Sequence, residues 1–255
     1  LLFFTFWTTL VFFLYFRQGW TFISLAIEPL SIIGIAVSFY LGFKNSQSYD
    51  RFWEARKIWG SIVNYSRTWG TQVLSLVEDT PEDQRILIYR HLAWINALRA
   101  QLRQATSFSL ARSHSFKRSI ERYKAYDSVT EIIRPFVSGE ELEDLEKRKN
   151  IATHLIKNQG LHLKKLLEEG GISEFQNLML HKVLEENYNF QGACERIKNT
   201  PFPRQYAYFG TIFAWIFVIL LPFGLLNAFD EEILEVKDSG LVWMEAAAIL
   251  LSVLI

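Results

Sequence analysis

Three bulky apolar residues, Ile35, Phe39 and Phe43, recur at every fourth position of one apolar segment. On a helix this spacing places them in a single stripe. Beyond Lys44 the chain continues directly into a charged, aromatic, amphipathic segment. A membrane helix with such a stripe supplies what a hydrophobic pore constriction needs, although lipid-facing or bundle-packing side chains follow the same pattern.

A second stripe, made of small residues, runs along the same segment. Its members recur at spacings of three and four residues, and they are Ser31, Gly34, Ser38 and Gly42. Small residues at these spacings let membrane helices approach closely. At about 100° per residue the small stripe lies beside the bulky one. We therefore expect the helix to pack on a neighbouring copy while it points its bulky stripe at a central axis.

No catalytic or metal-binding pattern is evident in the sequence. Five histidines lie between residues 91 and 181, and none forms an HExxH or Cys/His arrangement. A Walker loop, GxSxG and GxGxxG are also absent from the sequence. The single cysteine, Cys194, excludes an internal disulfide. We expect neither an enzyme nor a bound cofactor or metal, and the zero net charge gives no case for nucleic-acid binding.

Four apolar segments predict four membrane spans, with a regular second helix that starts near Leu30. They are residues 1–16, 20–43, 206–227 and 241–255. The first and last are shorter than the ~20 residues that cross a bilayer, so we expect the chain to be trimmed at both ends. The segment SYDRFWEARKIWG (48–60) suits a membrane–water boundary, and Arg51, Glu54 and Lys57 are spaced to pair along a helix.

Basic residues indicate the orientation in the membrane. Of the 27 Lys and Arg residues, only Arg17 and Lys237 lie outside residues 44–205. The charged residues of the connection 228–240 are instead five acids and one lysine. The positive-inside rule therefore places the central region and both termini in the cytoplasm.

Residues 44–205 predict a helical domain. Capping boxes are expected at Ser138 with Glu141 and at Ser173 with Gln176, and Gly170 is expected to end the helix between them. The expected fold is all-α, a four-span bundle (1–43 and 206–255) continuous with a helical cytoplasmic domain.

Several segments, in order along the chain, resemble the bestrophin family in its bacterial branch. SFYLGF (38–43) and SYDRFWEARKIWG resemble the family's second-helix signature. GACERIKNTPFP (192–203), with Tyr206, resembles the Cys-containing helix end and the start of the third span. LLPFGLL (220–226) resembles the end of that span.

The resemblance implies a homopentameric ion channel with one central pore, four membrane helices per subunit and a large helical cytoplasmic domain. The family's neck, lined by three apolar residues of the second helix, falls on Ile35, Phe39 and Phe43. A second constriction at the cytoplasmic exit falls near Gln176. The calcium-binding cluster of animal members would follow the fourth span, so the resemblance assigns no calcium control here.

The expected function is conduction of small monovalent ions, with membrane lipid and further copies of the chain as partners. Family members include anion and cation channels. Phe edges facing the axis would tolerate anions, whereas Phe faces would favour cations. Helix N-termini at Ser173 favour anions, and Glu168, Glu169 and Glu174 oppose this. We favour chloride, with a sodium-permeable channel or a non-conducting membrane scaffold as alternatives.

Overall fold

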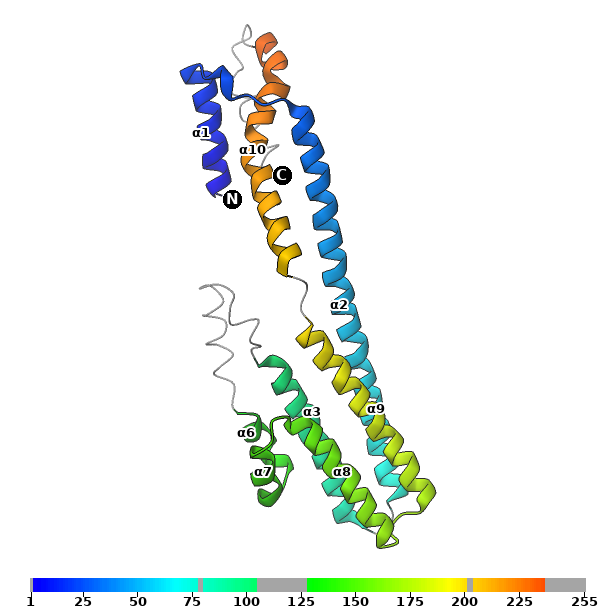
Figure 1. The fold of residues 1–255 in the computed structure, drawn as a ribbon. Coiled ribbons are helices and arrows are strands. Elements are labelled where there is room, and N and C mark those ends of the chain that lie inside the picture. Colours follow the sequence, from blue (N-terminus) through cyan, green and yellow to red (C-terminus); the bar gives the residue numbers. More distant parts are fainter. Residues whose placement is uncertain (1, 78–79, 105–127, 201–203, 237–255) are drawn as a thin grey trace. The chain divides into compact units, whose positions relative to one another are not determined.

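The computed structural model describes residues 2–77, 80–104, 128–200 and 204–236 of the 255-residue chain (Figure 1). Every regular element within these ranges is a helix, as the sequence predicts. The elements are α1 (Leu2–Gln18), η1 (Thr21–Ile23), α2 (Ile27–Leu76), α3 (Pro81–Arg103), α6 (Val129–Ile133), η2 (Arg134–Phe136), α7 (Gly139–Glu146), α8 (Ile151–Glu168), α9 (Glu174–Asn199) and α10 (Arg204–Val236). The predicted fourth span, residues 241–255, lies outside the described residues.

The helices divide into two compact units, and α2 contributes residues to both. The first unit comprises residues 1–49 and 202–255, and the second comprises residues 50–201. In the first unit α1 packs on α10, and Figure 1 shows α10 beside the first part of α2. Segments within Thr21–Leu76 and Tyr208–Leu226 are long and apolar enough to cross a membrane, whereas the apolar part of α1 is shorter.

Helix α2 begins at Ile27, earlier than the expected start near Leu30. Pro29 lies in its first turn, where a missing backbone N–H costs no intrahelical hydrogen bond. Pro29 therefore allows the helix to begin before Leu30.

Glycines allow α2 and α10 to approach closely. A Cβ added at Gly34 of α2 would lie 2.9 Å from Cε2 of Phe217 of α10, too close for a real contact. A Cβ added at Gly210 of α10 would overlap the ring of Tyr40 of α2. Each helix thus receives an aromatic ring of the other against bare backbone, which fixes the face that α2 turns towards its own chain.

A chain of hydrogen bonds crosses the core of the second unit. The indole N–H of Trp94 in α3 donates to Oε1 of Gln191 in α9, at 3.0 Å. Nε2 of Gln191 in turn donates to Oγ1 of Thr153 in α8, at 2.7 Å, and to Oε1 of Glu195, at 2.9 Å. Because buried polar groups must be paired, this chain sets the register of three helices.

The predicted capping box at Ser138 and Glu141 forms only in part. Oγ of Ser138 accepts a hydrogen bond from the N–H of Glu141 at 3.3 Å. The Glu141 carboxylate, however, accepts two bonds from Arg90 of α3, at 2.7 and 3.0 Å, and one from Asn158 of α8, at 2.8 Å. A bidentate guanidinium is a stronger partner than a neutral backbone N–H. Glu141 therefore joins α7 to two other helices instead of completing its own cap.

The ion pairs predicted among Arg51, Glu54 and Lys57 are wrong. Arg51 and Glu54 contact the C-terminal end of α9, and Nζ of Lys57 lies 5.8 Å from the ring centroid of Trp53. Arg51 donates to the carbonyl oxygens of Ile197 and Thr200, at 2.7 and 2.8 Å. Glu54 forms an ion pair with Arg196 at 2.8 Å. A cation at a helix C-terminus satisfies its last carbonyls and complements the helix dipole. This arrangement gives Arg51 and Glu54 partners outside their own helix.

His91 is buried in the core of the second unit between two indole rings. Its ring centroid lies 6.0 Å from that of Trp69 and 5.1 Å from that of Trp94. Burial disfavours the charged imidazolium and lowers the pKa of His91 to about 4. Between that pH and the ordinary histidine value near 6.5, the unfolded chain binds a proton that the folded chain does not.

Stability should therefore decrease as the pH falls from about 6.5 to about 4, with a contribution of about 3 kcal/mol from His91 alone. The His91→Phe variant keeps an aromatic ring between the indoles and removes the titration. We expect the difference in thermal stability between wild type and variant to change over this pH range and to be constant below it. Tryptophan fluorescence of the full chain in detergent measures both curves, and parallel curves would contradict the assignment.

Candidate functional site

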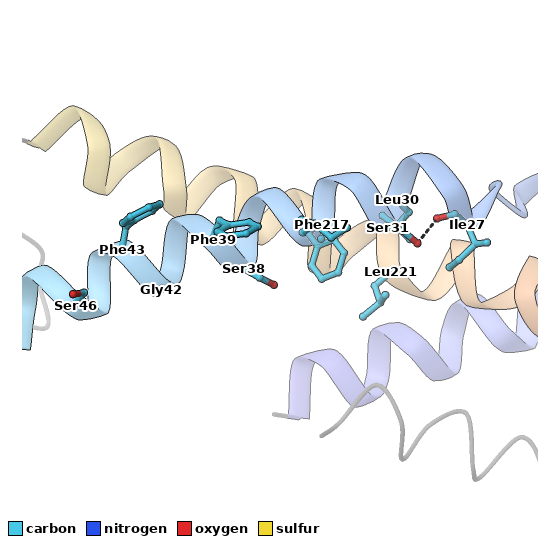
Figure 2. A pocket seen from close by; sticks show the side chains of 12 residues that line it. Ile27, Leu30, Ser31, Ser38, Phe39, Gly42, Phe43, Ser46, Phe217 and Leu221 are labelled. Atoms are coloured by element: carbon cyan, nitrogen blue, oxygen red, sulfur yellow. Dashed lines mark hydrogen bonds between the residues drawn. The ribbon is translucent and has the colours of Figure 1, made fainter.

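The predicted bulky stripe lies on the surface of α2 in the single chain. Ile35, Phe39 and Phe43 are 59%, 67% and 68% exposed. Figure 2 shows Phe39 and Phe43 one turn apart along α2. Large apolar side chains are unfavourable in water, and a continuous exposed stripe of them marks a candidate surface for contact with lipid, another copy or a narrow pore.

A groove of about 860 Å³ runs along α2 beside this stripe. Its floor includes the small residues of α2, and Phe217 and Leu221 of α10 reach into it (Figure 2). The groove is predominantly apolar, and Phe39 and Phe43 form part of its border. The two stripes recognised in the sequence thus meet at one surface feature of the first unit.

The small stripe is partly covered by the same chain and partly exposed. Gly34 is covered by Phe217 of the same chain, so its close packing is internal. Ser31, Ser38 and Gly42 stay exposed, and a Cβ at Gly42 would meet nothing within 4 Å. Oγ of Ser31 donates to the carbonyl oxygen of Ile27 at 2.8 Å, so its hydroxyl proton needs no outside acceptor (Figure 2).

Gln176 lies at the start of α9, and its side chain is engaged in the predicted capping box. Ser173 N–H donates to Oε1 of Gln176 at 2.7 Å, and Gln176 N–H donates to Oγ of Ser173 at 3.3 Å. The nearby apolar residues Phe175 and Leu178 are 71% and 56% exposed. The buried residues of α9 begin at Leu180 and recur at helical spacing, and Leu178 does not share their face. This spacing is the sequence signal for an exposed leucine near the start of α9.

Charged pairs surround the turn before α9. Glu168 pairs with Lys164 at 3.6 Å, and Glu169 pairs with Lys165 at 3.7 Å. All four side chains are more than half exposed, so these pairs add little stability but partly neutralise the acids. Gly170, with φ of 76°, ends the preceding helix as predicted.

Among the described residues, no group of three or more His, Cys, Asp or Glu side chains is placed to hold a metal ion. His162 contacts Asp83 at 2.8 Å and Arg90 at 3.1 Å, and His181 contacts the Asn177 carbonyl at 3.0 Å. These contacts give both histidines structural roles.

The comparisons with known proteins agree with one another. A family model described as bacterial/fungal bestrophin protein matches residues 1–234. The voltage-dependent anion channel-forming protein mll4386 of Mesorhizobium japonicum is 31% identical over 79% of this chain and 57% of its own length. The voltage-dependent anion channel-forming protein RSc3414 of Ralstonia nicotianae is 28% identical over 81% of this chain and 61% of its own length.

Solved structures resemble the fold of the whole chain. A bacterial bestrophin homologue from Klebsiella pneumoniae, phased with zinc, matches with a TM-score of 0.76 and 23% identity, over 99% of this chain and 81% of its own. A structure of a point mutant of the Klebsiella homologue gives the same TM-score, over 83% of its own chain. The chain spans about three fifths of the length of the curated relatives that it matches.

Proposed function

This chain belongs to the bacterial and fungal bestrophin family, and from that premise we propose that it is one subunit of a pentameric channel for small monovalent ions. Five copies of α2 would surround a central pore, with Ile35, Phe39 and Phe43 as three stacked apolar rings of its neck. Such rings offer no ligands to a dehydrated ion, so they gate by dewetting or by small helix movements.

The exposure of the neck stripe is the observation that carries this proposal. The opposite side of α2 is packed against α10, through Gly34 and Tyr40, while the stripe stays free. In a ring of copies these apolar side chains would line a narrow pore and would no longer face bulk solvent.

The proposed setting is the bacterial inner membrane, with residues 44–205 and both termini in the cytoplasm. The concentration of basic residues in 44–205 supports this orientation. Residues 1–43 and 206–255 would form the membrane part, in contact with lipid.

Chloride is the favoured ion, and sodium is the alternative. The matched relatives carry names that describe voltage-dependent anion channels. In this chain, the N-terminus of α9 would add positive dipole ends to the cytoplasmic exit, and the lysine partners of Glu168 and Glu169 offset two nearby acids. Glu174 in the first turn of α9 acts in the opposite direction.

We place the exit constriction, predicted near Gln176, within the first two turns of α9. Because the side chain of Gln176 is bound to the backbone of Ser173, Leu178 is the stronger candidate for the residue that narrows the pore. An exposed leucine would form a fourth apolar ring, of the same kind as the neck.

Replacing Ile35, Phe39 and Phe43 together by Ala should widen the neck and increase the current through purified full-length protein in planar bilayers. The matched control is Phe213→Ala, since Phe213 is 54% exposed on α10 and does not border the groove. Unchanged conductance in the triple variant would contradict the neck assignment. Absence of flux from the wild type in liposomes would instead favour the non-conducting scaffold.

In asymmetric sodium chloride, the reversal potential should be shifted from zero towards the equilibrium potential of chloride. The sign of this potential reports the permeant ion directly, and replacing sodium by a large organic cation should leave it unchanged. A reversal potential shifted towards the equilibrium potential of sodium would establish the cation-permeable alternative and reject the proposed anion preference.

At the exit, Leu178→Ala should change single-channel conductance more than Gln176→Ala does. The leucine side chain is exposed, whereas the glutamine side chain is held in its capping box. Gln176→Ala should lower the free energy of unfolding by about 1 kcal/mol, because it removes half of the capping box. A larger conductance change in Gln176→Ala would restore the original assignment of the aperture.

A further inference from the structure

A second apolar groove, of about 660 Å³, lies within the second unit and is lined by residues of α2, α3 and α9. The contribution of α2 recurs at spacings of three and four residues and so occupies one face of the helix: Phe52, Ala55, Arg56 and Trp59. Helix α9 contributes Ile197 and Lys198, also from one face, and α3 contributes Leu102. We call this feature the basic groove.

The walls of the basic groove are apolar and open to solvent. Phe52 is 60% exposed and Trp59 is 36% exposed. The contacts of Arg51 and Glu54 with the C-terminal end of α9 hold together two of the helices that line the groove. The groove is therefore a feature that specific contacts maintain, and its large exposed side chains mark it as a candidate binding surface.

Two cations provide all the charge among the described residues that line the basic groove. Cζ of Arg56 lies 5.8 Å from the ring centroid of Trp53, and Nζ of Lys198 donates to the carbonyl oxygen of Gln101. Within the described part of the chain neither cation forms an ion pair. Burial lowers the pKa of the Lys198 ammonium, and the charge of Glu195 offsets this effect only in part.

The acids nearest to these cations in the sequence are bound to other partners. Glu54 forms its ion pair with Arg196, at 2.8 Å. Glu195 accepts hydrogen bonds from Asn150, at 3.0 Å, and from Gln191, at 2.9 Å. Neither carboxylate is left to neutralise the groove, so an anion from outside the chain would be favoured there.

We propose that the basic groove binds a long-chain fatty acid, with the acyl chain along the apolar walls and the carboxylate bonded to Arg56 and Lys198. A guanidinium binds a carboxylate through two parallel hydrogen bonds, and an ammonium adds a point charge. The groove volume lies within the range of about 300–1,000 Å³ that is usual for small-molecule sites.

The lining favours an amphiphile over a more polar anion such as a nucleotide. The described lining residues include no amide, hydroxyl or carboxylate side chain that could read sugar or base groups. An acyl chain needs no such partners, because removal of its apolar surface from water supplies the binding energy. The site goes beyond the proposed channel function, since binding there does not require ion conduction.

Stearate brominated on its chain tests the site, because bromine quenches a tryptophan that it contacts and Trp59 lines the groove. With full-length protein in lipid nanodiscs, we expect quenching that saturates with the ligand. Trp59→Phe should remove most of this saturable quenching. The matched control is Trp20→Phe, which changes an exposed tryptophan of the first unit and should leave it unchanged. Saturable quenching that does not depend on Trp59 would place the ligand elsewhere and overturn the proposal, as would its absence from the wild type.

The charge requirement is tested by Arg56→Gln combined with Lys198→Gln, which should raise the dissociation constant by about tenfold or more. Lys157→Gln, at an exposed lysine of α8 outside the groove, should not change it. Brominated stearyl alcohol, which has the same chain and no charge, should bind the wild type about tenfold more weakly. Equal binding of the acid and the alcohol would reject the carboxylate site without relying on any variant.

Discussion

Close packing between α2 and α10 is the constraint on which the rest of the first unit depends. Phe217 lies against the backbone of Gly34, and Tyr40 lies against that of Gly210. Because bare backbone receives an aromatic ring in both directions, only one rotation of α2 about its own axis fits. That rotation turns the bulky apolar stripe away from α10 and leaves it exposed.

The second unit is organised by side chains that reach between helices instead of along them. Glu141 of α7 is held by α3 and α8, and Arg51 of α2 holds the last carbonyls of α9. A charged group bonded in this way cannot be satisfied by another register of the same helices. The polar contacts therefore specify one arrangement, while the largely aliphatic core, which includes Trp69 and Trp94, supplies the burial.

Helical spacing and capping residues were sufficient to predict helices throughout the described residues and the stripe on α2, because local periodicity and caps determine both. It identified Ile35, Phe39 and Phe43 as one face and placed the start of α9 at Ser173. It could not predict the partners of Arg51 and Glu141, since those lie far away in the chain. The sequence alone also could not show that Gly34 packs internally while Gly42 stays open.

The apolar rings of the neck have a consequence for permeation. In the proposed ring, the three apolar residues of the stripe present no hydrogen-bonding groups that replace an ion's water shell. The main cost of passage is then partial dehydration. Weakly hydrated, polarisable ions would cross more readily than compact ones of the same charge, which is a lyotropic order of permeability.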